Sequence, residues 1–108
     1  KAEQLALRVL LIAGIAGNDR TSYLHAMRAI PGWSALPRAA QADTPLLVVA
    51  GDRDYTPLAY KRAYVGQLRN ARLEVIEDSG HATPLDQPQR LNQLLQAFIA
   101  EHSPPVPA

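Results

Sequence analysis

Three residues that can take part in acid–base chemistry follow two short apolar segments of this sequence. Asp52 and Asp54 lie in "TPLLVVAGDRDYTP" (residues 44–57), where a run of aliphatic residues leads into two aspartates one residue apart. His81 lies in "SGHATPLDQP" (residues 79–88), directly after "ARLEVIED". A carboxylate that accepts a hydrogen bond from one ring nitrogen of a histidine fixes the imidazole tautomer, so the other nitrogen can take a proton from a nucleophile. An Asp and His81 could form such a pair.

The pair can form if the two apolar segments are nearby strands of one parallel sheet. "LLVVA" (residues 46–50) contains no polar residue, which is typical of a strand buried on both faces. Residues 71–78 alternate more, which indicates a strand nearer the sheet edge. Loops at the carboxyl ends of parallel strands emerge on the same edge, and neighbouring or next-neighbouring strands end roughly 5–10 Å apart. We therefore expect an aspartate on the first loop to reach His81.

Helical patterns surround the two strands. We predict four helices. The first covers residues 3–15, and the second runs from an N-cap at Thr21 to Ile30. The third runs from Pro57 to about Leu68 with Thr56 as its cap, and the fourth begins at Asp86 or Gln87. Residues 31–45 are expected to form an irregular or short helical connection. In the third helix, Tyr60, Tyr64 and Leu68 are spaced by four and are expected to be buried. The order strand, helix, strand, helix predicts a parallel β-α-β-α unit.

The combined motifs resemble a known family. "TPLLVVAGDRDYTP" followed by "NARLEVIEDSGHATPLDQPQRLNQLLQAFI" resembles the C-terminal part of the α/β-hydrolase fold over residues 44–100. In that family the last two core strands supply the catalytic acid and then the catalytic histidine. The resemblance implies that Asp54 is the triad acid, that His81 is the general base, and that Asp52 is a structural partner of its loop.

The resemblance also implies a fold class and a domain organisation. The expected fold is α/β, the C-terminal β-α-β-α portion of an α/β-hydrolase parallel sheet, preceded by two helices from the cap region. Residues 1–43 are expected to be this cap-derived helical segment and a connection, residues 44–102 the β-α-β-α portion, and residues 103–108 a loose tail. Because the first helix is apolar almost all round, it needs neighbours on several sides, and we expect the chain to be a piece of a longer protein.

The nucleophile of such an enzyme is missing from this pattern. The family carries its serine on a G-x-S-x-G turn between a strand and a helix, upstream of the acid and the histidine. The nearest match is "GWSAL", but its fifth residue is Leu36 and the preceding "AIP" is no strand, so we do not expect Ser34 to be the nucleophile. Ser79 lies in the same loop as His81 and also lacks this context. The predicted nucleophile and oxyanion hole therefore lie outside residues 1–108.

Simpler interpretations of the two residues and other α/β functions compete with this one. Asp54 could be an Asx-turn or helix N-terminal residue, and His81 an ordinary loop residue. His25 and His102 are expected to be plain helix residues, because no metal-ligand spacing surrounds them. A phosphoacceptor domain would need further acids and a downstream lysine, and a dinucleotide site would need G-x-G-x-x-G. Neither pattern is found in the sequence.

The composition limits the classes of partner. The chain has 108 residues, of which 47% are hydrophobic and 19% charged, a net charge of +1 and no cysteine. Interleaved charges form no basic stripe for nucleic acid or membrane, and the absence of cysteine suits a reducing compartment. We therefore expect a cytoplasmic protein without a nucleic-acid or membrane partner, and without a metal or organic cofactor.

Two functions follow from the sequence. The first is the C-terminal part of a serine hydrolase acting on a small-molecule carboxylic ester or related acyl bond, inactive as an isolated chain because the serine lies elsewhere. The second is a nonenzymatic α/β module that binds a partner through its exposed sheet edge. That partner would be the missing N-terminal part of its own fold, or a second copy in a homo-oligomer.

Overall fold

The computed structural model describes residues 2–104, with side chains from residue 5 onward. The chain divides into two compact units, Lys1–Ser34 and Ala35–Ala108. Of the tail expected at residues 103–108, Ser103 and Pro104 follow the last helix without regular structure, and residues 105–108 lie outside the described residues.

The first unit is helical. It contains α1 (Ala2–Ala16), α2 (Arg20–Ala29) and the 3₁₀ turn η1 (Ile30–Gly32). The two predicted helices are present, but the predicted N-cap Thr21 is wrong. The cap of α2 is Asp19, whose extended backbone precedes the helix and whose carboxylate accepts the backbone N–H of Ser22 at 2.8 Å. Asp is as good a cap as Thr, so the helix starts earlier than predicted.

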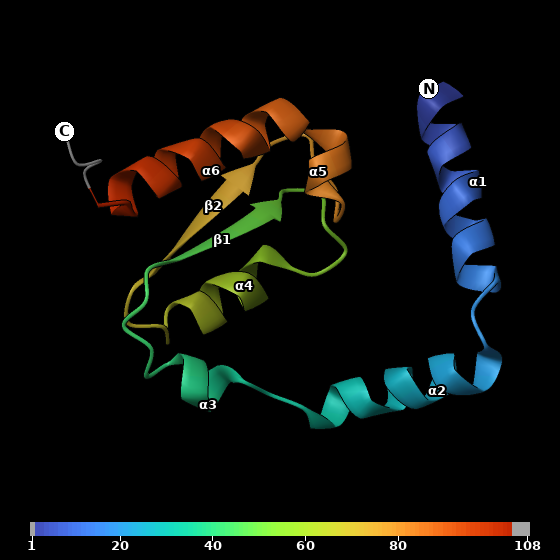
Figure 1. The fold of residues 1–108 in the computed structure, drawn as a ribbon, viewed down its shortest axis with the longest axis horizontal. Coiled ribbons are helices and arrows are strands. Elements are labelled where there is room, and N and C mark those ends of the chain that lie inside the picture. Colours follow the sequence, from blue (N-terminus) through green and yellow to red (C-terminus); the bar gives the residue numbers. More distant parts are fainter. Residues whose placement is uncertain (1, 105–108) are drawn as a thin grey trace. The chain divides into compact units, whose positions relative to one another are not determined.

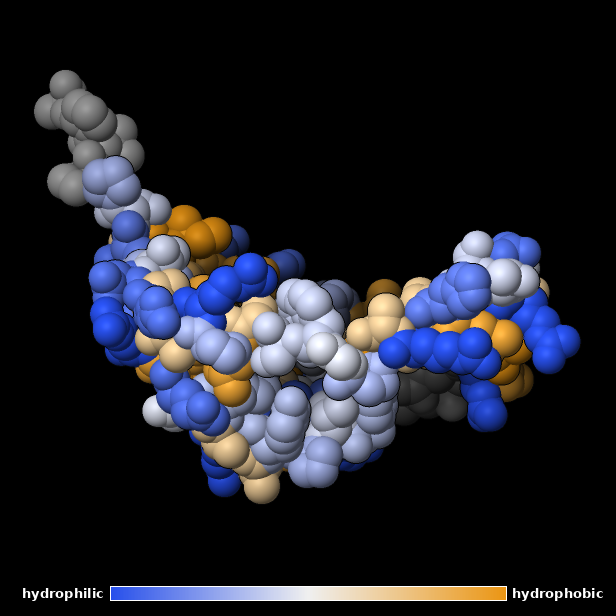
Figure 2. Space-filling model, turned by 90° about the horizontal axis from the view of Figure 1, so that it is seen from below, coloured by the Kyte–Doolittle hydropathy of each residue, from blue (hydrophilic) through white to orange (hydrophobic). Residues whose placement is uncertain are grey.

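The apolar side chains of α1 are open to solvent. Six of them are 51–70% exposed, namely Leu5, Val9, Leu10, Leu11, Ile12 and Ile15. Figure 2 shows hydrophobic side chains at the surface of both units. A helix that is apolar on all sides is normally covered by neighbours, so the described residues do not satisfy the burial that the sequence of α1 demands.

The second unit is a small α/β structure. Its elements in chain order are α3 (Leu36–Ala39), β1 (Leu46–Gly51), α4 (Leu58–Val65), β2 (Ala71–Ile76), α5 (Thr83–Asp86) and α6 (Pro88–His102). β1 and β2 pair in parallel, from Leu46 opposite Ala71 to Gly51 opposite Ile76. Helices α4 and α6 lie on opposite faces of this sheet (Figure 1). The predicted α/β class with a parallel β-α-β-α unit is therefore confirmed.

Helix α4 differs from its prediction in two ways. Pro57 is its N-cap and Leu58 its first residue, without a side-chain cap from Thr56, and the helix ends at Val65 before Gly66. The expected buried stripe is also wrong, because Tyr60 is 66% exposed. The buried residues of α4 are Lys61 and Val65. The buried face of α4 therefore carries Lys61 and Val65 rather than the tyrosines.

The loop after β2 contains a short helix that was not predicted. Residues 83–86 form α5, and Gln87 is the N-cap of α6, which begins at Pro88. The predicted amphipathic last helix is present. Among the described residues, the buried apolar side chains are Ala50, Val65 and Ile76, so the core of this unit is small.

Candidate active site

The loops after β1 and β2 lie side by side because the parallel register aligns the strand ends. Gly51 and Ile76 are register partners. The backbone N–H of Asp52 then donates to the carbonyl of Ile76 at 3.0 Å, and that of Arg53 donates to the carbonyl of Ser79 at 2.9 Å. The two loops therefore continue the sheet contact beyond the strands.

The close approach of the loops requires glycine at position 51. A Cβ atom there would lie 2.2 Å from the carbonyl oxygen of Ser79 and 2.3 Å from that of Gly80. Such distances lie far inside van der Waals contact, and the colliding atoms belong to the backbone and cannot rotate away. Gly51 thus allows the second loop to cross directly over the end of β1.

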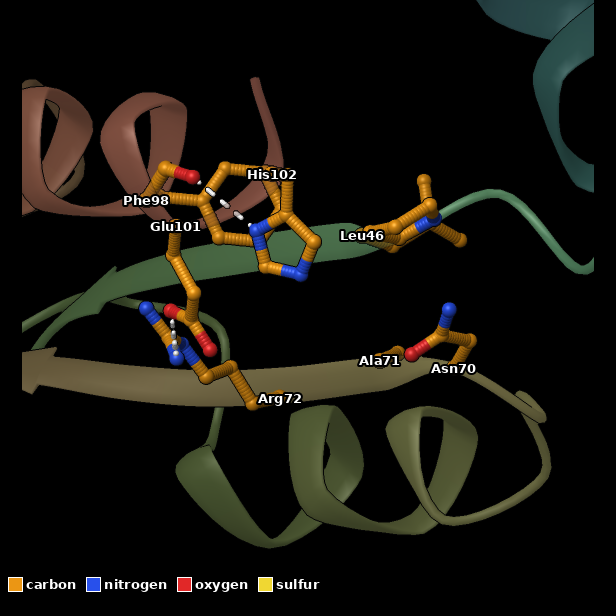
Figure 3. Close-up of a pocket in the computed structure, with 8 residues that line it drawn as sticks. Leu46, Asn70, Ala71, Arg72, Phe98, Glu101 and His102 are labelled. Carbon is orange, nitrogen blue, oxygen red and sulfur yellow. Dashed lines mark hydrogen bonds and ion pairs between the residues drawn. The ribbon is translucent and has the colours of Figure 1, made fainter. Parts of the chain in front are cut away.

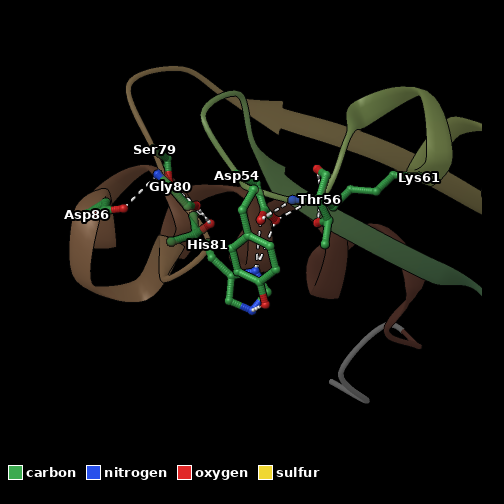
Figure 4. A network of polar contacts seen from close by, with 9 residues as sticks. Asp54, Thr56, Lys61, Ser79, Gly80, His81 and Asp86 are labelled. Carbon is green, nitrogen blue, oxygen red and sulfur yellow. Dashed lines mark hydrogen bonds and ion pairs between the residues drawn. The ribbon is translucent and has the colours of Figure 1, made fainter. Parts of the chain in front are cut away.

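Asp52 and Asp54 both link the two loops, in different ways. Asp52 accepts the backbone N–H of Ser79 at 3.1 Å, and this bond is the main cause that lowers the pKa of Asp52. Asp54 instead meets the side chain of His81, whose Nδ1 lies 3.1 Å from Oδ1 and 3.2 Å from Oδ2 (Figure 4). The structure therefore brings the two sequence-predicted site residues together, and places Asp52 as a structural partner not only of its own loop but of the next.

The carboxylate of Asp54 accepts from two further donors. The ammonium of Lys61 lies 2.9 Å from Oδ2, and the backbone N–H of Thr56 donates to Oδ1 at 3.0 Å in an Asx turn. The bond from Lys61 is the largest cause that holds the pKa of Asp54 well below its ordinary value of 3.8, followed by the bond from Thr56, and His81 adds to them. Asp54 is therefore an ionised acceptor at neutral pH.

The imidazole of His81 is oriented by this acceptor. An ionised carboxylate can only accept, so Nδ1 carries the proton in the contact with Asp54, and Nε2 of the neutral ring is an acceptor. The side chain of Asp54 is 6% exposed, whereas that of His81 is 61% exposed. The arrangement places a fixed acid behind a histidine whose second nitrogen faces outward.

Tyr55 lies on the outward side of His81. The two ring centroids are 4.6 Å apart, and the tyrosine hydroxyl lies 3.4 Å from Nε2. This long contact is compatible with a weak hydrogen bond from the phenol to the ring nitrogen. The outward nitrogen of His81 is thus within reach of a hydroxyl group.

The loop that carries His81 is held by α5. The carboxylate of Asp86 accepts the backbone N–H of Gly80 at 2.7 Å. Ser79 is fully buried, and its hydroxyl contacts the Thr83 hydroxyl at 3.2 Å. Ser79 therefore has a structural place in this loop and is not accessible as a nucleophile, while Ser34 belongs to the first unit.

Comparisons with known proteins identify the fold. The chain is 38% identical over 68 residues to a protein of Cronobacter turicensis that is named as a carbamate hydrolase, RutD. A hydrolase from Thermoplasma acidophilum described as CIB-like matches with a TM-score of 0.59 and 24% identity, over 62% of this chain and 33% of its own. The α/β-hydrolase MGS-MChE2, from a metagenome of lagoon sediments of Mar Chica, Morocco, matches with a TM-score of 0.57 and 28% identity, over 61% and 31%.

This chain carries a portion of the α/β-hydrolase fold. The predicted resemblance to the α/β-hydrolase fold is thereby confirmed, and the similar proteins are hydrolases. The match to RutD covers 62% of this chain but 26% of the relative, so the chain spans about a quarter of that length. No family model matches the chain.

Lys61 is the site residue of this α/β-hydrolase portion that sequence reasoning missed. It lies seven residues after Asp54, in the first turns of α4. A positive charge near a helix N-terminus is unfavourable for the helix dipole, and this anomaly was the available signal. The spacing of the tyrosines predicted that a different face of the same helix would be buried.

A pocket lies at the opposite end of the strands. It has a volume of about 170 Å³ and lies between the beginnings of β1 and β2 and the end of α6 (Figure 3). Its polar side chains include Arg72 and Glu101, which form an ion pair at 2.7 Å, and His102, which contacts the Phe98 carbonyl at 2.9 Å. The pocket is therefore separate from Asp54 and His81.

Residues 2–104 lack two classes of feature. No group of three or more His, Cys, Asp or Glu side chains has a metal-binding arrangement there. No helix in that part of the chain has the length and hydrophobicity to cross a membrane.

Proposed function

We propose that this chain supplies the acid and the base of a Ser-His-Asp triad in a hydrolase of carboxylic esters or related acyl bonds. The observation that carries the proposal is the contact of Nδ1 of His81 with both carboxylate oxygens of Asp54, at the carboxyl ends of paired parallel strands. This contact leaves Nε2 for proton transfer. In such a sheet, reactive groups gather at these strand ends.

The proposed mechanism is nucleophilic. A serine outside residues 1–108 attacks the carbonyl carbon of the substrate while Nε2 of His81 accepts its proton. The imidazolium is stabilised by the ionised Asp54 and then returns the proton to the leaving group. In the second half of the reaction, His81 takes a proton from a water molecule that attacks the acyl carbon, and it returns the proton to the serine oxygen as the acyl–serine bond breaks. The role of Asp54 is to keep the ring in the required tautomer and orientation.

The experiment compares His81→Ala and Asp54→Asn with the wild type in the full-length protein that carries this segment. We expect hydrolysis of p-nitrophenyl esters to fall about 10⁴-fold in each variant, because triad members act as a unit. The name of the RutD relative makes aryl carbamates the second series to assay. His102→Ala changes an exposed histidine at the end of α6; it is the matched histidine control and should retain activity.

A fluorophosphonate probe followed by peptide mapping locates the nucleophile. We expect a His81-dependent adduct on a serine outside residues 1–108. An adduct on Ser34 or Ser79, or ester hydrolysis that is unchanged in His81→Ala, would contradict the proposal.

A second candidate is a nonenzymatic module that binds a partner through the sheet edge. Within the described residues, β1 pairs with β2 alone in a two-stranded sheet, which leaves the other edge of β1 without a strand partner. Its partner would be the remainder of the same fold or a second copy of the chain. A stable monomer in sedimentation analysis would contradict this candidate. A cytoplasmic location stays a prediction from the cysteine-free sequence, to be tested by cell fractionation.

A further inference from the structure

Lys61 lies beneath the Asp54 carboxylate rather than at the surface. The residue is 8% exposed, and lysine is almost never buried unless it is paired. Its ammonium lies 2.9 Å from Oδ2 of Asp54 and 2.7 Å from the carbonyl oxygen of Thr56, and it also contacts the Thr56 hydroxyl. Three acceptors therefore match the three N–H donors of the ammonium, which fixes its position.

The orientation of the carboxylate depends on this ammonium. Oδ2 of Asp54 is held by Lys61, and Oδ1 is held by the backbone N–H of Thr56. A carboxylate held at both oxygens cannot rotate about its Cβ–Cγ bond without breaking one of these hydrogen bonds. Because Nδ1 of His81 faces both oxygens, the direction of the imidazole depends on the same two donors.

We propose that Lys61 is a positioning residue that holds the Asp54 carboxylate in the orientation that His81 requires for proton transfer. The inference rests on the proposed function, since the orientation of His81 matters for a reaction only if its ring transfers a proton. The three hydrogen bonds of the Lys61 ammonium go to Asp54 and Thr56, and His81 meets the same carboxylate, so Lys61 acts through Asp54.

An ammonium suits this role for a physical reason. The side chains of Lys61 and Asp54 are 10% and 6% exposed, so little water is present to solvate the carboxylate on that side. The positive charge keeps the acid ionised without donating a proton to it. A carboxylate that stays ionised can accept from Nδ1 throughout the reaction, whereas a protonated acid would lose this contact.

The first test measures kinetics in the full-length protein that carries this segment. We expect Lys61→Met to lower kcat for p-nitrophenyl acetate roughly 10- to 100-fold, since small misplacements of reacting groups have effects of this size, and to leave KM unchanged. Lys61→Arg should recover part of the loss because a guanidinium still donates to the carboxylate. Arg62→Met removes a positive charge from the neighbouring, exposed position of α4 and should stay within about twofold of the wild type.

The second test follows the Asp54 carboxyl carbon by NMR as the pH is lowered, in the same proteins. The hydrogen bond from Lys61 is the largest cause that lowers the pKa of Asp54, so Lys61→Met should raise that pKa and Arg62→Met should not. Thermal unfolding of each variant shows whether it is folded under the assay conditions. A purely structural lysine would change the unfolding temperature without changing kcat in folded protein.

The outcomes separate this inference from the proposed function. If the wild type hydrolyses esters, and Lys61→Met equals Arg62→Met in kcat and in the Asp54 titration, the positioning role is overturned. If the wild type hydrolyses no ester or carbamate, the proposed function fails, and an unchanged Asp54 titration in Lys61→Met overturns the positioning role independently. If Lys61→Met does not fold, the wild-type titration decides, because an Asp54 carboxyl that titrates at its ordinary pKa would overturn the role.

Discussion

At the scale of the residue, Asp54 joins three parts of the chain. Its carboxylate accepts from the backbone of its own loop at Thr56, from Lys61 on α4 and from His81 on the next loop. The three partners differ in their roles. Lys61 and Thr56 hold the carboxylate in place as constant donors, whereas His81 gains and loses a proton in the proposed reaction. The aspartate is therefore both a structural tie and the candidate triad acid.

The low pKa of Asp54 predicts a pH dependence of stability. A carboxyl whose pKa is lower in the folded state than in the unfolded state stabilises the fold when it is ionised. This contribution is complete above about pH 5 and is lost as the pH falls below the ordinary aspartate value toward the lowered one. Asp54→Asn should therefore have a lower urea midpoint than the wild type at pH 7, and the difference should shrink at about pH 2.

The control for this prediction is Asp43→Asn, which changes a side chain that is 87% exposed. It should stay close to the wild type at both pH values, because exposed ion pairs contribute little. A gap between Asp54→Asn and the wild type that is equal at pH 7 and at about pH 2 would contradict the role of ionisation.

At the scale of the element, the parallel pairing of β1 with β2 sets the site. The register brings the ends of the two strands together, and α5 holds the second loop through the bond from Gly80 to Asp86. Helix α4 follows the first loop, and its residue Lys61 donates a hydrogen bond to Asp54 in that loop. Each of these elements is short, so their joint geometry depends on the contacts between loops.

A substitution at Gly51 tests whether the close crossing of the two loops stabilises the protein. We expect Gly51→Ala to destabilise the protein by roughly 1–3 kcal/mol, the usual range for overpacking, and to lower ester hydrolysis in the full-length protein, because the new methyl group collides with the carbonyls of Ser79 and Gly80. Chemical denaturation and the ester assay measure the two effects. Gly32→Ala is the control, since a Cβ there meets nothing within 4 Å. Equal unfolding free energies for the two variants would contradict the predicted collision.

At the scale of the whole molecule, the described residues expose much apolar surface. Among the residues that the structure describes, sixteen large hydrophobic side chains are exposed. The chain spans 26% of the RutD relative and about a third of the two similar structures. Large exposed apolar patches mark surfaces that contact other protein. We infer that the rest of an α/β-hydrolase fold is the natural cover for this surface.

We expect residues 1–108, produced alone, to associate in solution and to bind a hydrophobic dye, without hydrolysing esters. The chain would lack both a nucleophile and an oxyanion hole, which together provide most of the rate enhancement of such enzymes. Sedimentation velocity, dye fluorescence and the ester assay check the three parts. Ester hydrolysis by residues 1–108 that disappears in His81→Ala would contradict this expectation.

Much of the fold was predictable from local patterns. The aliphatic run of β1 and the spacing of apolar residues in α6 predicted both elements close to their observed bounds. Both patterns are local, because a buried strand needs consecutive apolar residues and an amphipathic helix needs them at the helical period. The meeting of an aspartate with His81 was predictable from strand geometry, since parallel strands align their carboxyl ends. The choice of Asp54 over Asp52 came from the resemblance to the α/β-hydrolase fold. The caps were predicted less well, because Asp19 and Thr21 are both good caps and the choice depends on the backbone.

Residue order alone predicted the α/β class, the order of the two strands and the longer helices, and the meeting of an aspartate with His81 at the strand ends. The resemblance to the α/β-hydrolase fold selected Asp54 as that aspartate. Three features of the site became visible only in the folded chain: Lys61 is buried against Asp54, α5 supports the loop of His81, and Ser79 is enclosed. These are contacts between side chains and loops of different elements, and they depend on how closely the backbones approach. Residue types and spacing set which groups can meet, whereas packing selects the donors that reach Asp54.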